Sequence, residues 1–265
     1  MYNQSYNQLL DIIKPYQRLC VSYSGGVDST FLAKAAIDAL GKENVLCVLI
    51  KGYALPAREY ANAIRYADAI GAELAVLDVD EFAVEQFGGN TTDRCYHCKK
   101  FIFSHIFKFM KSKGYDILAC GSNVDDLSDY RPGNRAVEEA GVKCPLIEAD
   151  FDKEKIRQLS RELGLESGDN PSSPCLASRV PYGRSITPQM LKQIDKAESY
   201  LYDMGMSPLR VRHYGDTAKI EVPCEYMEKA VAMSEKIVSA FKDIGFTYIT
   251  LDLEGFRSGA MNEVL

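Results

Sequence analysis

Residues 22–30 read Ser22-Tyr23-Ser24-Gly25-Gly26-Val27-Asp28-Ser29-Thr30 and lie between a short apolar run and a predicted helix over Ser29–Leu40. At such a junction the free N–H groups and the positive end of the helix dipole point into the loop. The two glycines let the backbone approach an anion closely, and the hydroxyl groups add hydrogen-bond donors. We therefore predict a phosphate-binding loop. Its expected nucleotide-binding residues are Ser22, Ser24, Gly25, Gly26, Asp28 and Ser29.

Strand-like and helix-like segments alternate on either side of this loop. The predicted strands are short apolar runs: Arg18–Tyr23, Asn44–Ile50, Glu73–Val79, Asp116–Gly121 and Lys143–Ile147. The predicted helices are Ser29–Leu40, Pro56–Ile70, Tyr96–Lys113, Gly133–Ala140 and Lys153–Leu163. Continuous apolar strands joined by helices are typical of a parallel sheet that is buried on both sides. The predicted fold class is therefore α/β, with a parallel twisted sheet and helices on both faces.

The composition changes after this part of the chain. Residues 166–185 are rich in Ser, Pro, Gly and Arg, which indicates a long ordered loop or a domain junction. The elements predicted beyond it are the helices Thr187–Met204 and Glu225–Asp243 and the strands Leu209–His213, Ala218–Val222 and Phe246–Leu253. We expect a nucleotide domain over residues 1–170 and a smaller α+β domain over residues 171–265.

Two further segments follow predicted strands, at the sheet edge where ligands collect in folds of this type. Lys51 comes after the second strand, and we expect it beside the adenine. Gly121 comes after the fourth strand, and Asp125 and Asp126 follow it closely. Two adjacent carboxylates suit Mg²⁺ or a ribose, and the alternative is a solvated acidic turn.

The bulk properties narrow the class of function. The formal net charge is −6 over 265 residues, which argues against a general nucleic-acid binder because such proteins carry basic patches. The sequence has no run of 18 apolar residues, and because its first residues are polar we expect no secretory leader. We expect a cytoplasmic protein with no nucleic-acid partner and no membrane attachment.

The chain has eight cysteines, more than packing requires, and disulfides are not expected in a reducing cytosol. Four lie inside apolar runs and are interpreted as small buried side chains: Cys20, Cys47, Cys120 and Cys144. Cys224 follows a proline at a predicted helix start and is also interpreted as structural. The remaining three, Cys95, Cys98 and Cys175, lie in polar, loop-like contexts.

These three cysteines are candidate metal ligands. Cys95 and Cys98 form a C-x₂-C pair at the start of a predicted helix, a position that favours the thiolate. Cys175 lies in a proline-rich loop flanked by arginines. Three thiolates can hold three corners of a [4Fe–4S] cluster and leave one iron open. With His97, His105 or water as a fourth ligand they can instead hold Zn²⁺, and metal-free thiols are the third alternative.

The motif Ser24-Gly25-Gly26-Val27-Asp28-Ser29 is neither a Walker A loop nor a Rossmann glycine pattern, and it resembles the loop of the PP-loop ATP pyrophosphatases. Over essentially the whole chain the resemblance narrows to the LarE family of ATP-dependent sulfur transferases. It rests further on Asp125-Asp126 through Arg131-Pro132-Gly133, Pro174-Cys175-Leu176-Ala177-Ser178-Arg179, Arg210-Val211-Arg212-His213-Tyr214-Gly215-Asp216 and Phe256-Arg257-Ser258-Gly259. It implies a PP-loop domain of the adenine-nucleotide α-hydrolase type that binds ATP, with Asp28 helping to hold Mg²⁺.

The LarE resemblance also implies a reaction, in the biosynthesis of the nickel-pincer nucleotide cofactor. A carboxylate of pyridinium-3,5-biscarboxylic acid mononucleotide attacks the α-phosphate of ATP, and pyrophosphate leaves. Sulfur then displaces AMP and a thiocarboxylate forms. An anionic substrate of this kind needs converging guanidinium groups. The expected residues are Arg179, Arg210, Arg212 and Arg257 for binding, and Asp28 and Cys175 for catalysis.

The source of the sulfur separates two mechanisms. Some family members have only the cysteine equivalent to Cys175 and give up its own sulfur, which leaves dehydroalanine. The additional pair Cys95 and Cys98 favours instead a [4Fe–4S] cluster with a replaceable sulfide, supplied as sulfide or by a sulfur-donor system. We also expect a homo-oligomer. The main alternative is a PP-loop tRNA thiolation enzyme. Two others are a non-catalytic nucleotide sensor and an amidotransferase-type ligase, in which Cys175 would have no role.

Overall fold

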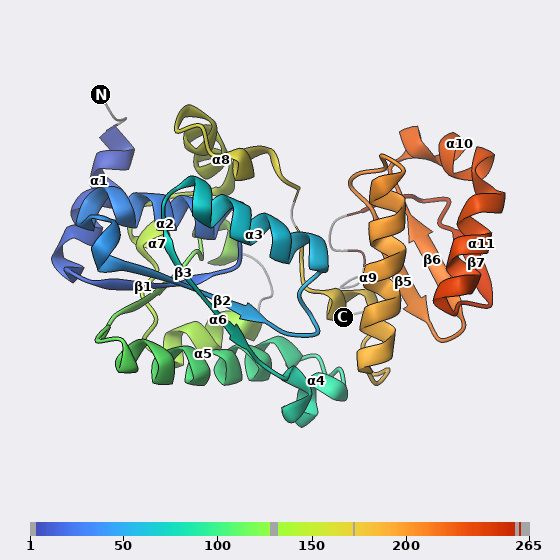
Figure 1. Ribbon diagram of the computed structural model, residues 1–265, viewed down its shortest axis with the longest axis horizontal. Coiled ribbons are helices and arrows are strands. Elements are labelled where there is room, and N and C mark those ends of the chain that lie inside the picture. The colour runs from blue at the N-terminus through green and yellow to red at the C-terminus, as the bar shows by residue number, and fades with distance from the viewer. Residues whose placement is uncertain (1–3, 128–131, 172, 258–259, 261–265) are drawn as a thin grey trace. The chain divides into compact units, whose positions relative to one another are not determined.

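The computed structural model describes residues 4–127, 132–171, 173–257 and 260. The chain forms two compact units (Figure 1). The first unit runs to Ser173 but leaves out Phe87–Thr92, and the second contains that segment together with the chain from Pro174 on. Asn90 ties the segment Phe87–Thr92 to the second unit, because its side-chain amide donates to the carbonyls of Val180 and Arg184. Of the family motifs, residues 128–131, 258 and 259, which include Arg131, Ser258 and Gly259, lie outside the described residues.

The first unit contains a parallel four-stranded sheet in the order β3-β2-β1-β4. Its strands are β1 (Leu19–Tyr23), β2 (Val45–Lys51), β3 (Glu73–Asp78) and β4 (Leu118–Cys120). The predicted α/β class is confirmed. The strand order reverses between β1 and β4, so the loops that follow these two strands meet at the point where such sheets bind ligands.

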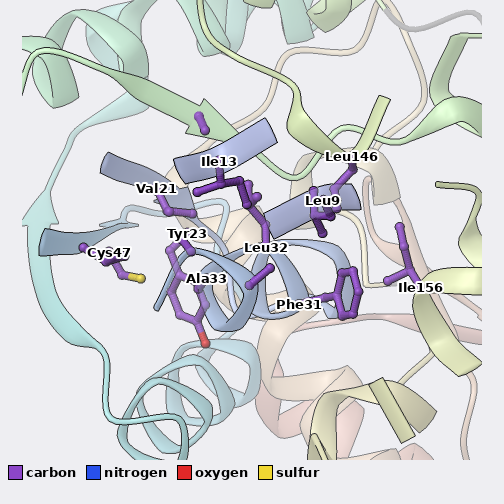
Figure 2. Close-up of a cluster of buried hydrophobic side chains, with 14 of the residues drawn as sticks. Leu9, Ile13, Val21, Tyr23, Phe31, Leu32, Ala33, Cys47, Leu146 and Ile156 are labelled. Carbon is purple, nitrogen blue, oxygen red and sulfur yellow. The ribbon is translucent and has the colours of Figure 1, made fainter. Parts of the chain in front are cut away.

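Helices cover both faces of this sheet (Figure 1). One face packs against α1 (Gln4–Ile13), α2 (Val27–Leu40), α3 (Ala57–Ala69), α7 (Pro145–Glu148) and α8 (Lys153–Glu162). The other face packs against α5 (Arg94–Ser112) and α6 (Pro132–Glu139). Figure 2 shows Phe31 and Leu32 of α2 among side chains of α1 and the strands. This packing fixes the first turns of α2 beside the end of β1.

One predicted strand of the first unit is wrong. Lys143–Ile147 forms only a single bridge, between Ala119 and Lys143, before α7 begins at Pro145. Proline has no N–H to donate to a strand ladder, and its fixed φ suits the first turn of a helix. The apolar run therefore ends as a short helix against the core rather than as a fifth strand.

The second unit is a smaller α+β structure. Its sheet has the order β5-β6-β7, with β5 (Arg210–Tyr214) antiparallel and β7 (Tyr248–Leu251) parallel to β6 (Thr217–Glu221). Its longer helices are α9 (Pro188–Asp203), α10 (Cys224–Ala232) and α11 (Ser234–Ile244). The single helix predicted over Glu225–Asp243 is wrong. The helix is interrupted at Met233, and a new helix begins at Ser234, a residue type that favours helix starts. None of the helices described is long and apolar enough to cross a membrane.

Candidate functional site

The phosphate loop, residues 22–30, joins β1 to α2. Gly25 has a left-handed φ of 75°, and a β-carbon at this position would overlap the Ala63 side chain of α3. Glycine alone meets both conditions without strain. Gly26 is the N-cap of α2, and no side chain of the described residues caps this helix end. The N–H groups of the first turn can therefore point at an anion.

Hydroxyl groups brace the loop from within. The Ser29 hydroxyl donates to the Gly26 carbonyl at 3.1 Å and lies 3.1 Å from the Ser24 hydroxyl. The backbone N–H of Ser24 donates to the Ser29 hydroxyl at 3.2 Å, and that of Gly26 donates to the Ser24 hydroxyl at 3.3 Å. Ser29 is buried, whereas Ser24 and Gly26 are exposed. The loop thus has a fixed shape and an open side.

The end of β4 lies against this loop. A β-carbon on Gly121, the residue after β4, would lie 2.8 Å from the Ser29 nitrogen and 2.9 Å from the Asp28 carbonyl carbon. Ser22 is partly buried in β1, where it pairs in register with Cys120 of β4. The structure therefore brings Ser22, Gly121 and the first turn of α2 together.

One carboxylate oxygen of Asp28 is available to bind a cation. Its Oδ2 lies 2.5 Å from the Lys153 amine of α8, whereas its Oδ1 is buried and has no hydrogen-bond partner among the described residues. Burial raises the pKa of the Asp28 carboxyl above its ordinary value, Lys153 opposes the rise, and the negative charge of Asp126 adds to it. A buried carboxylate oxygen of this kind is a donor that Mg²⁺ prefers. The donor set therefore fits the metal that the PP-loop resemblance implies.

Lys153 was not predicted as a site residue, because it lies 125 positions from Asp28 and no local sequence pattern marks it. Its backbone N–H donates to Asp125 Oδ2 at 2.9 Å, which places that exposed carboxylate at the N-terminus of α8. Asp126 is buried and accepts a hydrogen bond from the Asn123 N–H at 3.1 Å. A cavity of about 540 Å³ opens here and is lined by Asp125, Lys153, Glu154, Arg157, Gln158 and Arg161. Polyphosphate oxygens would find both cations and acidic metal ligands in it.

The expected adenine segment lies in the turn after β2. Lys51 is exposed and its amine lies 3.5 Å from Asp78 of β3. The buried Glu81 shapes the turn, since its carboxylate accepts the N–H groups of Tyr53 at 2.9 Å and Ala54 at 3.3 Å. A β-carbon on Gly52 would overlap that carboxylate. Glu81 is a positioning residue that the sequence analysis missed.

Cys95 and Cys98 lie three positions apart near the start of α5, and both are partly exposed. His97, considered above as a zinc ligand, has its Nε2 2.9 Å from Asp93 Oδ2, and His105 Nδ1 lies 3.0 Å from the Phe101 carbonyl. Within residues 4–127, 132–171, 173–257 and 260, no three His, Cys, Asp or Glu side chains are grouped so as to hold a metal ion. Cys175 belongs to the second unit, and the [4Fe–4S] cluster therefore stays a prediction.

The Cys175 turn, residues 174–179, exposes the Cys175 thiol at the N-cap of a short 3₁₀ helix. Arg179 is fully buried beneath it. One guanidinium nitrogen of Arg179 donates to the carbonyls of Pro174 at 2.6 Å and Cys175 at 3.2 Å, and to the Ser178 hydroxyl at 2.9 Å. Arg179 therefore holds the backbone that presents the thiol.

Glu198 of α9 completes this support. Its two oxygens each lie 2.9 Å from a guanidinium nitrogen of Arg179, and one of them also accepts the Val211 N–H at 2.9 Å. Burial works against the charge of Arg179, but Glu198 outweighs it and holds the pKa of the guanidinium above its ordinary value. The sequence carries a signal for Glu198, because it lies on the same helix face as the buried Ile194 and Leu201. A carboxylate on an apolar face needs a buried partner.

The remaining predicted arginines differ in exposure. Arg212 is buried, pairs with Glu221 at 2.8 Å and donates to the Ser178 carbonyl at 2.9 Å. Arg210 is buried beside the Phe256 ring, and burial together with the charge of Arg179 lowers the pKa of its guanidinium. Arg257 is exposed and pairs with Glu254 at 2.7 Å. Arg179 and Arg212 thus both contact the Cys175 turn, Arg210 lies close to them, and buried carboxylates neutralise Arg179 and Arg212.

Comparison with known proteins agrees with this geometry. Residues 5–100 match the NAD synthase family, a stretch that contains the phosphate loop. The chain is 40% identical over 250 residues to an uncharacterized protein from Synechocystis sp., covering 94% of this chain and 93% of the relative. It is 36% identical over 257 residues to the pyridinium-3,5-bisthiocarboxylic acid mononucleotide synthase of Lactiplantibacillus plantarum, covering 97% and 93%. It is 27% identical over 203 residues to a tRNA-specific 2-thiouridylase from Carboxydothermus hydrogenoformans, covering 59% and 54%.

Proposed function

Because the chain belongs to the LarE family of PP-loop ATP pyrophosphatases, we propose that it is an ATP-dependent sulfur transferase that forms AMP and pyrophosphate. The proposed substrate is pyridinium-3,5-biscarboxylic acid mononucleotide, a carboxylate of which is adenylated and converted to a thiocarboxylate. The Lactiplantibacillus relative is named for the bisthiocarboxylic acid mononucleotide. The reaction would serve the biosynthesis of the nickel-pincer nucleotide cofactor.

The observation that carries this proposal is the uncapped N-terminus of α2 beside the buried Oδ1 atom of Asp28. The first-turn N–H groups and Lys153 would bind the phosphates that leave as pyrophosphate. Asp28, with Asp125 at the same edge of the sheet, would hold Mg²⁺, which neutralises phosphate charge. Arg210, Arg212 and Arg257 would bind the carboxylates or the phosphate of the substrate.

For the sulfur step we propose that Cys95, Cys98 and Cys175 hold a [4Fe–4S] cluster. The proposal rests on the C-x₂-C spacing and on the exposure of the Cys175 thiol. When bound, the cluster would supply a replaceable sulfide to the adenylated substrate. The part of Arg179 and Glu198 would be to hold Cys175 in place.

The adenylation is tested with the purified protein, ATP, Mg²⁺ and the pyridinium substrate. Pyrophosphate should appear only when the substrate is present, and mass spectrometry should find oxygen replaced by sulfur in the product. Asp28→Ala should remove pyrophosphate release while leaving the circular dichroism spectrum unchanged. Release that depends on tRNA rather than on the pyridinium substrate would overturn the proposed function in favour of a tRNA thiolation enzyme.

The sulfur source is tested on anaerobically purified protein. A cluster enzyme should contain iron, should turn over repeatedly when given sulfide, and should lose both properties in Cys95→Ser. A sacrificial enzyme should stop after one turnover and lose about 34 Da at Cys175, as the thiol becomes dehydroalanine. That mass loss together with a fully active Cys95→Ser variant would exclude the cluster mechanism.

Three further expectations belong to this proposal: a sulfide or sulfur-donor partner, a cytoplasmic location and a homo-oligomeric state. Light scattering of the purified protein measures the last. An unchanged rate of pyrophosphate release in the presence of added tRNA would support the expectation that nucleic acid is not a partner.

A further inference from the structure

A second pair of cysteines lies outside the proposed mechanism. Cys120 is the last residue of β4 and Cys144 is the N-cap of α7, and their sulfur atoms lie 3.8 Å apart. Their place in apolar runs of the sequence predicts that both are small buried packing residues. Cys20 and Cys47 are fully buried, whereas Cys144 is partly exposed. Cys144 is therefore a thiol that reagents can reach, in contact with a second, buried thiol.

The backbone around the pair already has the geometry of neighbouring strands. The Cys120 N–H donates to the Lys143 carbonyl at 3.0 Å, and the Lys143 N–H donates to the Leu118 carbonyl at 2.8 Å. Adjacent strands lie about 4.8 Å apart, which falls within the Cα separation of about 4.4–6.8 Å that a disulfide spans. Closing the gap between the sulfur atoms to about 2.05 Å needs only a local movement.

The surroundings of the pair favour one thiolate. The hydrogen bond with Cys144 lowers the pKa of the Cys120 thiol, and the Ser122 hydroxyl at 3.3 Å and the positive charge of Lys99 act in the same direction. The same hydrogen bond raises the pKa of Cys144. An accessible thiol in contact with a thiolate is the arrangement from which thiol–disulfide exchange proceeds.

We propose that Cys120 and Cys144 are a reversible oxidation site, at which a small-molecule disulfide converts the two thiols into an intramolecular disulfide that weakens ATP binding. Cys144 passes its proton to Cys120 and attacks one sulfur of the small disulfide, and a first small thiolate leaves. Cys120 then attacks the sulfur of Cys144 and displaces the second small thiolate. The one proton that the pair holds passes to the first small thiolate, and the second small thiolate takes a proton from the solvent, so the small disulfide is reduced to two thiols as the protein pair is oxidised.

Gly121 connects this site to the phosphate loop. It directly follows Cys120, and it packs so closely against the phosphate loop that a β-carbon here would collide with the Ser29 nitrogen and the Asp28 carbonyl carbon. A disulfide would draw the end of β4 toward α7 and remove the contact of Cys120 with Ser122. The first turn of α2 would then lose the support that shapes the anion site. This coupling rests on the proposed nucleotide site, whereas the disulfide itself does not.

The test uses the full chain with the other accessible cysteines replaced by serine: Cys95, Cys98, Cys175 and Cys224. After treatment with oxidised glutathione, alkylation and digestion with trypsin without reductant, peptides 114–135 and 144–153 should be found linked. Calorimetry should show ATP affinity about tenfold weaker in the oxidised protein, and dithiothreitol should restore it.

Cys144→Ser in the same background is the matched control, because serine has a similar size and is favoured at a helix N-cap. It should bind ATP as the reduced protein does and should not respond to oxidised glutathione. Absence of the linked peptides would overturn the oxidation site, and linked peptides with unchanged ATP affinity would overturn its coupling to the phosphate loop. If the reduced natural protein, with all its cysteines in place, fails to bind ATP, the proposed function fails instead, and the peptides still decide whether the disulfide forms.

Discussion

The phosphate loop and the Cys175 turn are built in opposite ways. The phosphate loop takes its shape from its own glycines and hydroxyls, through contacts such as that between Ser24 and Ser29. The Cys175 turn takes its shape from distant residues, because Arg179 reaches Glu198 and the Ser178 carbonyl accepts a hydrogen bond from Arg212. An arginine near a reactive cysteine can therefore serve the shape of the turn, and its loss then acts on stability as well as on binding.

The strongest test of this difference is Arg179→Met. It leaves Glu198 buried without its cation, which costs about 3–5 kcal/mol of the free energy of unfolding for a buried pair. Denaturant unfolding measures the loss. Hydrogen exchange of the Val211 N–H, which donates to Glu198, should report it locally. Activity should fall with stability, since the turn that presents Cys175 loses its support.

Arg257→Met is the matched control for the stability of the second unit. Arg257 pairs with Glu254 on the surface, where an ion pair contributes less than about 1 kcal/mol. Equal losses of stability in the two variants would contradict the view that the buried pair holds the Cys175 turn.

The addition of a single β-carbon should be enough to disrupt the phosphate loop. Gly25→Ala forces a left-handed φ on alanine and drives its β-carbon into Ala63, so we expect ATP-dependent pyrophosphate release to fall about a hundredfold or more. Gly71→Ala is the matched control, because Gly71 has a similar φ of 69° and open space around it. It should lose about 1 kcal/mol of stability and keep its activity. A Gly25→Ala variant as active as Gly71→Ala would contradict the need for glycine at position 25.

The predictable part of the fold and the site is the part whose physics is local. Alternating apolar runs and helices indicated the parallel sheet, and the two glycines with their neighbouring serines indicated the anion loop before any contact was known. The same reasoning failed at Lys143–Ile147, where the apolar run outweighed the proline at position 145. The break at Met233 was missed because the helical pattern of apolar residues continues across it.

The unpredicted part of the site depends on residues that meet only in the folded chain. Glu81 caps a turn 28 positions away, and nothing beside it in the sequence marks that task. Glu198 had a signal, a carboxylate among Ile194 and Leu201, but its partner could not be named without the structure. Charge patterns therefore pointed to arginines of interest without separating those that hold the turn from those that face a ligand.

Lys153 is the exception to the local construction of the phosphate loop, because it pairs with Asp28 from a helix that is distant in sequence. Lys153→Met leaves the Asp28 carboxylate buried without its cation, and we expect kcat/KM for ATP to fall about 10- to 100-fold. Lys155→Met is the control on the same helix, since the Lys155 amine donates to the Asp150 carbonyl. The activation free energy that corresponds to kcat/KM for ATP should change by no more than about 0.5 kcal/mol in this variant. Equal effects would mean that α8 contributes general positive charge rather than a specific partner for Asp28.

The smallest expected effect is a pH dependence of stability that arises from His213 in the second unit. His213 is buried in β5, with Nε2 3.3 Å from Gln193 Oε1 and with Nδ1 lacking a hydrogen-bond partner among the described residues. Burial lowers the pKa of His213 below its ordinary value of 6.5, Asp216 opposes the shift and Arg184 adds to it. The unfolded chain therefore binds the proton more readily. Above pH 6.5 both states are neutral and His213 has no effect, whereas below it the unfolded chain gains the proton and stability falls. We expect a loss of about 1 kcal/mol between pH 7 and pH 5 that His213→Gln removes. Unfolding measured at both pH values checks this, and an undiminished loss in His213→Gln would assign the acid sensitivity to other groups.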